Sequence, residues 1–387
     1  MFNLKNNLRY FFVYLLKRLG VTKESLRALA LRLIKKNKLQ REITLLYYQF
    51  IDEYPFPSYD KLNNKIFKNF LDSNNQNIPL YKNFRNYIKP GWEVYFDSSK
   101  TLQKPPNKDL LKDRISLCKK QLNSVVDVLA KHSFQISNKT HILEIGTYDG
   151  AIAYELASRG AASVQGSDIE SYYINETNQD ITNKTIKNKK SDLNNLRNAY
   201  RECYEDEIAN IVSFIDDDIC QSSIPSNSKD LVVSWEVLEH IINPKAAFQE
   251  IFRILKPGGI SFHEYNPFYS VNGGHSLCTL DFPWGHARLS AKDFDNYLKL
   301  LRPNERELAL KFFHKNLNRL TIKTLQSYLQ TIGFEIILLL PWVDKDHFKR
   351  IDINIVNDCK NLYPDVQITD LISPSIWLII KKPEHQN

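Results

Sequence analysis

The residues with the clearest chemical meaning are an acid and two glycines at close spacing, Glu144, Gly146 and Gly150, with a second acid downstream at Asp168. The short apolar run 141–145 ends at the first glycine, a helical pattern follows the second, and another apolar run ends at Asp168. A strand, a glycine turn, a helix, a strand and an acid in this order form the βαβ unit that binds a nucleoside-bearing cofactor.

The turn indicates that this cofactor carries a positive charge. A dinucleotide turn has the pattern G-x-G-x-x-G, because its middle glycine lets the backbone approach a pyrophosphate. Here Tyr148 occupies the middle position, and Glu144 places a carboxylate beside the turn. A carboxylate repels a pyrophosphate and attracts a cationic ligand.

The E-x-G-x-x-x-G pattern resembles motif I of class I S-adenosylmethionine (SAM) methyltransferases. Further segments follow in the order found in that family: acid-isoleucine at 218–219, D-L-V-V-S at 230–234, V-L-E-H at 237–240 and L-K-P-G-G at 255–259. The resemblance implies an enzyme that uses SAM as its cofactor, in the group that includes many small-molecule O- and N-methyltransferases.

The resemblance also implies a role for each matching residue. Glu144 would lie near the amino end of the methionine part, Asp168 would take both ribose hydroxyls, and Ile169 would lie beside the adenine. Asp218 matches the acid that meets the amino group of adenine, because an isoleucine follows it. Tyr148 replaces a commoner glycine, so the turn is either wider or covered by the tyrosine. The expected cofactor-binding residues are Glu144, Gly146, Tyr148, Gly150, Asp168, Ile169, Asp218, Ile219 and Ser234.

Three histidines are candidate catalytic residues. Methyl transfer from a sulfonium is an in-line displacement, and a hydroxyl or amine acceptor must lose a proton, for which histidine is the usual base. His240 follows the fourth predicted strand, while His275 and His286 lie in the aromatic stretch 265–290 after the fifth. Ligands bind at the carboxyl ends of strands in open α/β sheets, so we expect this stretch to line the substrate pocket.

The same region also suggests a metal-assisted alternative. Glu236, Glu239 and His240 have E-x-x-E-H spacing, which would place them on one face of a helical turn. With His286 or His275 they could bind a divalent cation that holds and acidifies a substrate hydroxyl. This arrangement resembles metal-dependent O-methyltransferases that act on quinone precursors and RNA 3′ ends. V-L-E-H is widespread in the superfamily without a metal, so a purely structural or base role stays open.

The order of the patterns predicts an α/β fold. The resemblance implies a doubly wound, Rossmann-like sheet of seven strands in the order 3-2-1-4-5-7-6, with strand 7 antiparallel. We assign this domain to residues 107–387, with insertions at 175–209, 266–319 and 343–373, of which the first is expected to be exposed at the sheet edge. Residues 1–106 are predicted to form a basic, amphipathic, helical extension.

The positive charge of the 387-residue chain is concentrated at its start. The net charge is +8, and residues 1–50 hold 11 Lys and Arg against 2 Asp and Glu, which leaves 41 basic and 42 acidic residues elsewhere. A nucleic-acid substrate needs a basic surface, so the near-neutral catalytic domain argues against one. Residues 1–50 fit either contact with an anionic membrane surface or a protein partner, or packing on the protein's own core.

These observations favour a methyltransferase acting on a hydroxyl or amine of a small molecule, such as a sugar or a lipid-linked intermediate. One alternative is an RNA 2′- or 3′-end methyltransferase that clamps RNA with residues 1–50. The other is a non-catalytic partner subunit that has kept the SAM-binding fold. Five scattered cysteines without a C-x-x-C pair fit a reducing cytosol, so we expect a cytoplasmic protein, at the membrane surface if the extension binds lipid.

Overall fold

The computed structural model describes residues 65–93, 107–169, 183–343 and 350–384. The amphipathic pattern predicted for residues 1–50 lies outside these ranges. Among the described helices, none is both long enough and apolar enough to cross a bilayer.

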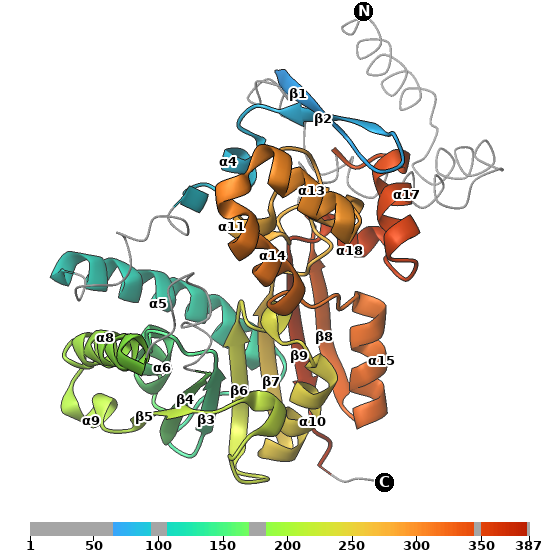
Figure 1. Cartoon of the computed structure of the whole chain (residues 1–387). Coiled ribbons are helices and arrows are strands. Elements are labelled where there is room, and N and C mark those ends of the chain that lie inside the picture. Colours follow the sequence, from blue (N-terminus) through green and yellow to red (C-terminus); the bar gives the residue numbers. More distant parts are fainter. Residues whose placement is uncertain (1–64, 94–106, 170–182, 344–349, 385–387) are drawn as a thin grey trace, which may run out of the picture.

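A seven-stranded sheet forms the centre of the molecule (Figure 1). Its strands are β3 (His141–Ile145), β4 (Ser163–Asp168), β5 (Val212–Asp216), β6 (Lys229–Trp235), β7 (Leu255–Tyr265), β8 (Glu335–Trp342) and β9 (Ser375–Lys381). They lie in the order β5-β4-β3-β6-β7-β9-β8, and β9 runs antiparallel to both of its neighbours. Counted from β3, this is the order 3-2-1-4-5-7-6 with an antiparallel seventh strand, so the predicted fold is confirmed.

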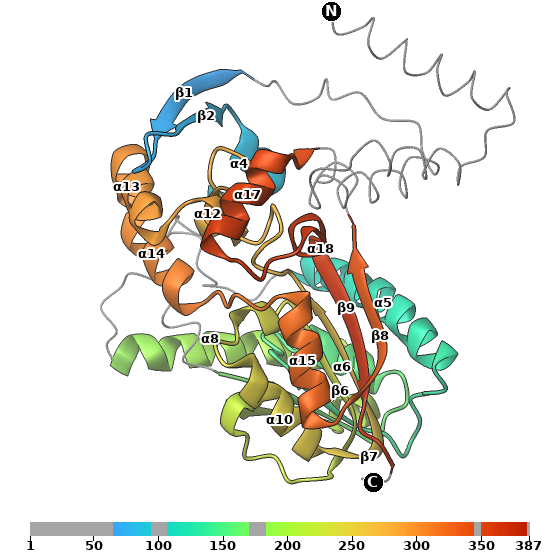
Figure 2. The same ribbon diagram turned by 90° about the vertical axis from the view of Figure 1, so that its right-hand side faces the viewer.

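Helices cover both faces of the sheet (Figure 2). One face carries α5 (Lys108–Lys131), α6 (Ala151–Ala157), α8 (Asn183–Arg201) and α9 (Asp206–Ala209), and the other carries α10 (Pro244–Ile254) and α15 (Ile322–Ile332). Successive side chains of a strand point to opposite faces, so Ile142 of β3 packs in the first layer and Leu143 in the second. Burial on both faces explains why the central strands read as continuous apolar runs.

The segment 175–209 is not an exposed insertion in its described part. Helix α8 connects β4 to β5, and Leu196 and Tyr200 are buried in the same apolar layer as α6. The Nε of Arg197 donates a hydrogen bond to the carbonyl of Tyr148 at 3.0 Å. The helix therefore supports the glycine turn, although Asn194, Asn195 and Asn198 on its other side are exposed.

The remaining elements build a cap over the carboxyl edge of the sheet (Figures 1 and 2). The cap consists of β1 (Ile66–Leu71), β2 (Asn77–Tyr81), α4 (Phe84–Ile88), α11 (His275–Cys278), α12 (Gly285–Arg288), α13 (Ala291–Leu301), η6 (Pro303–Glu305), α14 (Arg306–Lys315), α17 (Ile353–Leu362) and α18 (Ile368–Ile372). One apolar core joins all of these elements except η6, with Leu80, Phe294 and Val356 among its fully buried members.

The cap unites three segments that the sequence suggested were separate. They are the end of the N-terminal extension and the two insertions that follow β7 and β8. Contrary to the prediction of a helical extension, residues 66–81 form a β-hairpin. The hairpin is tied to the first insertion by a 2.8 Å hydrogen bond from Ser73 Oγ to Asp293 Oδ2, and α4 by an ion pair of Arg85 with Glu305 at 2.8 Å.

Candidate active site

The turn after β3 has the geometry that its glycines predict. Gly146 and Gly150 have φ values of 73° and 77°, in the left-handed region that favours glycine. A Cβ atom on Gly146 would lie 2.2 Å from Cγ2 of Val237, and one on Gly150 would lie 2.5 Å from the ring of Phe214. Both positions therefore require glycine for conformation and for space.

Tyr148 connects the turn to the acid at the end of β4. Its φ of 42° is uncommon for a residue with a side chain. The conformation is held by its N–H, which donates to Asp168 Oδ2 at 2.8 Å, and by the bond from Arg197 to its carbonyl. The structure thus brings together the two acids and glycines of the motif, with Asp168 only 7 % exposed.

Glu144 is buried directly beneath this turn, with 3 % of its surface exposed. Its Oε2 accepts a hydrogen bond from Thr147 Oγ1 at 2.7 Å. Burial raises the pKa of Glu144 to about 8, and the threonine only partly opposes this. At neutral pH the acid is therefore largely protonated, and a nearby cation would favour its ionised form.

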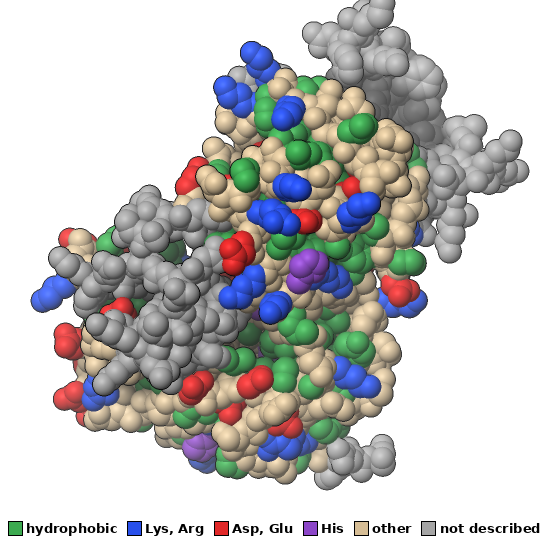
Figure 3. All heavy atoms as spheres, viewed as in Figure 1, with side chains coloured by type: hydrophobic (Ala, Val, Ile, Leu, Met, Phe, Trp, Pro, Cys, Tyr) green, Lys and Arg blue, Asp and Glu red, His purple; other side chains and the backbone are tan. Residues whose placement is uncertain are grey.

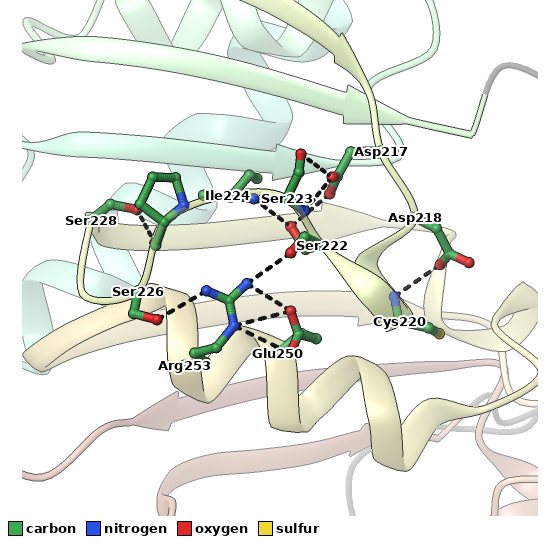
Figure 4. A network of polar contacts seen from close by, with 11 residues as sticks. Asp217, Asp218, Cys220, Ser222, Ser223, Ile224, Ser226, Ser228, Glu250 and Arg253 are labelled. Atoms are coloured by element: carbon green, nitrogen blue, oxygen red, sulfur yellow. Dashed lines mark hydrogen bonds and ion pairs between the residues drawn. The ribbon is translucent and has the colours of Figure 1, made fainter.

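The two consecutive acids after β5, Asp217 and Asp218, have different environments (Figure 4). Asp217 is buried and accepts hydrogen bonds from Ser222 Oγ at 2.7 Å and from the N–H and Oγ of Ser223 at 2.8 Å. Asp218 is exposed and caps the 3₁₀ helix η4 (Ile219–Gln221) through Cys220 N at 2.9 Å. The carboxylate of Asp217 therefore fixes the conformation of the loop. The carboxylate of Asp218 is exposed, so a ligand could reach it.

Three other predicted cofactor residues have contrasting environments. The side chain of Ile219 belongs to the apolar core under α10, whereas Ile169 is exposed beyond the end of β4. Ser234 is fully buried, and its Oγ lies 2.7 Å from Nδ1 of His263, whose Nε2 lies 2.5 Å from Ser261 Oγ. The Ser234 side chain is therefore part of a polar chain inside the sheet layer and does not face a ligand.

A second group of chemically active residues lies where the 3₁₀ helix η5 (Leu238–His240) meets the cap. Ligand atoms of Glu239, His240 and His275 all lie within 4.8 Å of one another. Glu239 Oε1 is 3.9 Å from His275 Nε2, and the two imidazole centroids are 4.8 Å apart. Val237, which contacts the cofactor turn at Gly146, immediately precedes η5, so this junction cluster lies beside the turn.

Burial keeps the junction cluster largely uncharged at neutral pH. It raises the pKa of Glu239 to about 8 and lowers the pKa of His240, and it lowers that of His275 further. The Nδ1 of His240 lies 2.7 Å from the carbonyl of Asn316. A carbonyl can only accept, so Nδ1 carries the proton and Nε2 carries a lone pair.

Comparison with known proteins agrees with the fold and the turn. A family model described as a methyltransferase domain matches residues 112–339. The chain belongs to the methyltransferase domain family. Together with the strand order, this match makes the protein a class I SAM-dependent methyltransferase.

Two curated relatives are similar to part of this methyltransferase. Sterol 24-C-methyltransferase ERG6A of Gibberella zeae is 28 % identical over 129 residues, and sterol 24-C-methyltransferase erg6 of Aspergillus fumigatus is 26 % identical over 129 residues. Each match covers 33 % of this chain and 28 % of the relative's own length.

Solved structures include a SAM-dependent methyltransferase from Mesorhizobium loti. It is 15 % identical to this chain, covers 65 % of it and 94 % of its own length, and has a TM-score of 0.37.

The structure does not bring together all the residues of the predicted E-x-x-E-H metal site. Glu236 has a φ of 55° and precedes η5, so it does not share a helical face with Glu239. It is exposed and accepts a hydrogen bond from Asn266 Nδ2 at 3.2 Å. His286 is buried in the cap, with Nε2 2.7 Å from the carbonyl of Phe268. Glu236 and His286 therefore lie outside the junction cluster, and His275 supplies its second imidazole.

Two residues of this region went unrecognised in the sequence. A Cβ on Gly166 of β4 would lie 2.6 Å from Thr147 Oγ1, so this glycine makes room for the threonine that bonds to Glu144. A glycine inside an apolar strand is a signal of such a close approach. Lys89 follows α4 in the cap, and burial lowers its pKa although Glu236 and Glu239 are close enough to oppose that shift. No local pattern connects Lys89 with residues so far along the chain.

Proposed function

We propose that this methyltransferase transfers a methyl group to a hydroxyl or amine of a small molecule bound between the sheet edge and the cap. The observation that carries the proposal is the junction cluster, in which the half-buried imidazoles of His240 and His275 lie beside the buried Glu239 and can accept a proton. Methylation of a hydroxyl, or of an amine that carries a hydrogen, releases a proton that such a group can accept.

The turn fits SAM as the cofactor. A side chain at Gly146 or Gly150 would collide with Val237 or Phe214, so the turn requires the two glycines of the motif. Glu144 would ionise beside the ammonium of the methionine part, and Asp168 would hold the ribose. When bound, SAM supplies the electrophilic methyl group.

The junction cluster supplies the groups that this chemistry needs from the protein. His240 Nε2 would accept the proton of the substrate, while the Asn316 carbonyl holds the ring in place. Once ionised, above its pKa of about 8, Glu239 would stabilise the positive charge that forms on the imidazole, because a carboxylate next to an imidazolium favours the charged pair. Phe312, which meets both histidine rings edge-on, shields the cluster from water.

Charge on the visible surface supports a small-molecule acceptor. On the face shown in Figure 3, the described residues include both basic and acidic side chains around the cap and the sheet layer. An RNA backbone would require a continuous basic path.

Carbon is the second candidate acceptor, because the two curated relatives are named as sterol 24-C-methyltransferases. The chemical shift of a transferred ¹³C-methyl group distinguishes products methylated on oxygen, nitrogen and carbon. Incubation with ¹³C-methyl SAM and matched panels of alcohols, amines and sterols therefore tests the acceptor. An O- or N-methyl product would support the proposal, and exclusive C-methylation would overturn it.

The cofactor site is tested by calorimetric titration with SAM and with its demethylated product. We expect the Asp168→Ala variant to bind SAM at least tenfold more weakly, because the acid also holds the turn through Tyr148. Glu335→Ala is the matched control, since this exposed acid begins β8 at the opposite edge of the sheet. Unchanged affinity in Asp168→Ala would contradict the site assignment.

A further inference from the structure

We propose that Glu239, His240 and His275 form a binding site for one divalent transition-metal ion of the zinc type, which links the sheet edge to the cap. The inference deepens the proposed function because the site lies in the proposed substrate pocket. It rests on the junction cluster alone and does not depend on the identity of the methyl acceptor.

Two buried polar atoms of the junction cluster lack a hydrogen-bond partner. Among the described residues, Oε2 of Glu239 and Nε2 of His275 are buried without a hydrogen-bond partner. Leaving such atoms unsatisfied costs about 1–3 kcal/mol each. Both belong to the set whose ligand atoms lie within 4.8 Å of one another, so a single ion could satisfy them together.

The atoms behind the junction cluster orient its ligands. The Nδ1–H of His240 donates to the Asn316 carbonyl, which turns the lone pair of Nε2 away from that contact. The other oxygen of the carboxylate, Glu239 Oε1, accepts from Asn266 N–H at 3.1 Å. Metal-binding histidines and carboxylates commonly have such second partners, which fix the tautomer and the direction of the ligand atom.

The donor set selects the kind of ion. Two imidazole nitrogens and one carboxylate oxygen suit zinc, cobalt, nickel or ferrous iron, whereas magnesium and calcium prefer oxygen ligands. Three protein ligands also leave a coordination position open, as in catalytic rather than structural zinc sites. A hydroxyl or amine of the substrate could occupy that position. In the metal-bound protein the ion, rather than His240 Nε2, would then make the acceptor easier to deprotonate.

This ligand set differs from the E-x-x-E-H set that the sequence suggests. Glu236 is exposed and bonded to Asn266, and His286 is bonded to a backbone carbonyl. Lys89 also faces this region, and its positive charge opposes a bound cation. Replacing the lysine with an uncharged residue should therefore tighten metal binding.

The test uses the full chain after treatment with a chelator. Zinc binding is measured by calorimetry, and cobalt binding by the visible absorption that four- or five-coordinate cobalt gives. We expect one ion per chain, at least tenfold weaker binding in Glu239→Gln and His275→Asn, and tighter binding in Lys89→Met. Asparagine is chosen because it tolerates the φ of 51° at His275.

Glu236→Gln is the matched control and should bind zinc within about twofold of the wild type, because Glu236 lies outside the ligand set (order-of-magnitude criterion). SAM affinity reports folding in every variant. No stoichiometric uptake of zinc or cobalt would overturn the proposal, as would an equal loss in Glu236→Gln and His275→Asn or a preference for magnesium. If metal-free protein binds SAM and forms O- or N-methyl products at the full rate, the metal proposal fails while the proposed function stands.

Discussion

At the scale of single residues, two buried carboxyl groups, Glu144 and Glu239, are central to the proposed chemistry of this methyltransferase. Each lies beneath a proposed ligand position, one at the cofactor turn and one at the junction with the cap. Burial raises the pKa of each to about 8, so both are largely neutral before a ligand arrives. A cationic ligand bound at either place would favour the ionised form of the acid, and the resulting ion pair would strengthen its binding.

The first prediction concerns the pH dependence of stability without ligand. The pKa of Glu144 rises from 4.5 when exposed to about 8 in the folded protein, so the folded state binds the extra proton. Its contribution to stability is complete below the lower pKa and is lost as pH rises toward 8. Between pH 5 and pH 8, the free energy of unfolding of wild type should fall by roughly 3 kcal/mol relative to Glu144→Gln. Urea unfolding at several pH values measures this difference, and parallel curves for the two proteins would contradict it.

The second prediction concerns proton release on cofactor binding. An ammonium group beside Glu144 should lower its pKa, so binding of SAM near neutral pH should release up to about one proton. Calorimetry in buffers with different heats of ionisation counts this proton. The Glu144→Gln variant should release none, and equal release from both proteins would show that another group titrates.

At the scale of secondary-structure elements, the turn between β3 and α6 is held in place by its neighbours. The N–H of Tyr148 donates to Asp168, and its carbonyl accepts from Arg197. Strand β4 and helix α8 therefore hold the turn from two sides. The next loop approaches from the other direction, where Val237 fills the space above Gly146. The turn therefore has no room for a side chain at Gly146.

The third prediction compares two glycines with similar backbone conformations. Gly146 and Gly160 have φ values of 73° and 85°, but an added Cβ would collide with Val237 only at Gly146. Gly160→Ala should lose about 1 kcal/mol of stability from the backbone alone. Gly146→Ala should lose more and should also abolish SAM binding. Thermal unfolding and SAM titration test both variants, and similar behaviour would mean that the contact with Val237 is unimportant.

At the scale of the whole molecule, the protein consists of a SAM-binding sheet layer and a cap assembled from three distant segments. The two insertions leave the sheet layer at the edge where β7 and β8 end, because both strands run antiparallel to β9. The cap supplies His275, Asn316 and Lys89 around the junction cluster. This division suggests that the sheet layer binds the cofactor while the cap selects the acceptor.

The fourth prediction tests that division. Leu80 lies on the hairpin and is fully buried in the core of the cap, so Leu80→Ala should destabilise the cap by about 2–5 kcal/mol. Hydrogen exchange should increase in α13, α14 and α17 but change little in β3 and β4. SAM affinity should stay within about twofold of the wild type, because the proposed cofactor residues all belong to the sheet layer (order-of-magnitude criterion). If hydrogen exchange increased equally in all these elements, the sheet layer and the cap would unfold as one unit.

Local sequence patterns were sufficient to predict the sheet and the cofactor turn. Apolar runs, glycines at left-handed positions and proline in the first turn of α10 are effects of neighbouring residues, so β3 and its turn could be located without knowing the rest of the chain. The family resemblance supplied the strand order and the role of Asp168.

Only the tertiary structure decided how the cap and the junction cluster are built. Ser73 and Asp293 bond to each other although 220 positions separate them, and no local periodicity encodes such a contact. The choice of His275 over His286 depends on which imidazole finds a backbone carbonyl inside the cap. Segments that look like unrelated insertions bury their apolar faces only against one another, so their common core becomes visible only when the whole chain is folded.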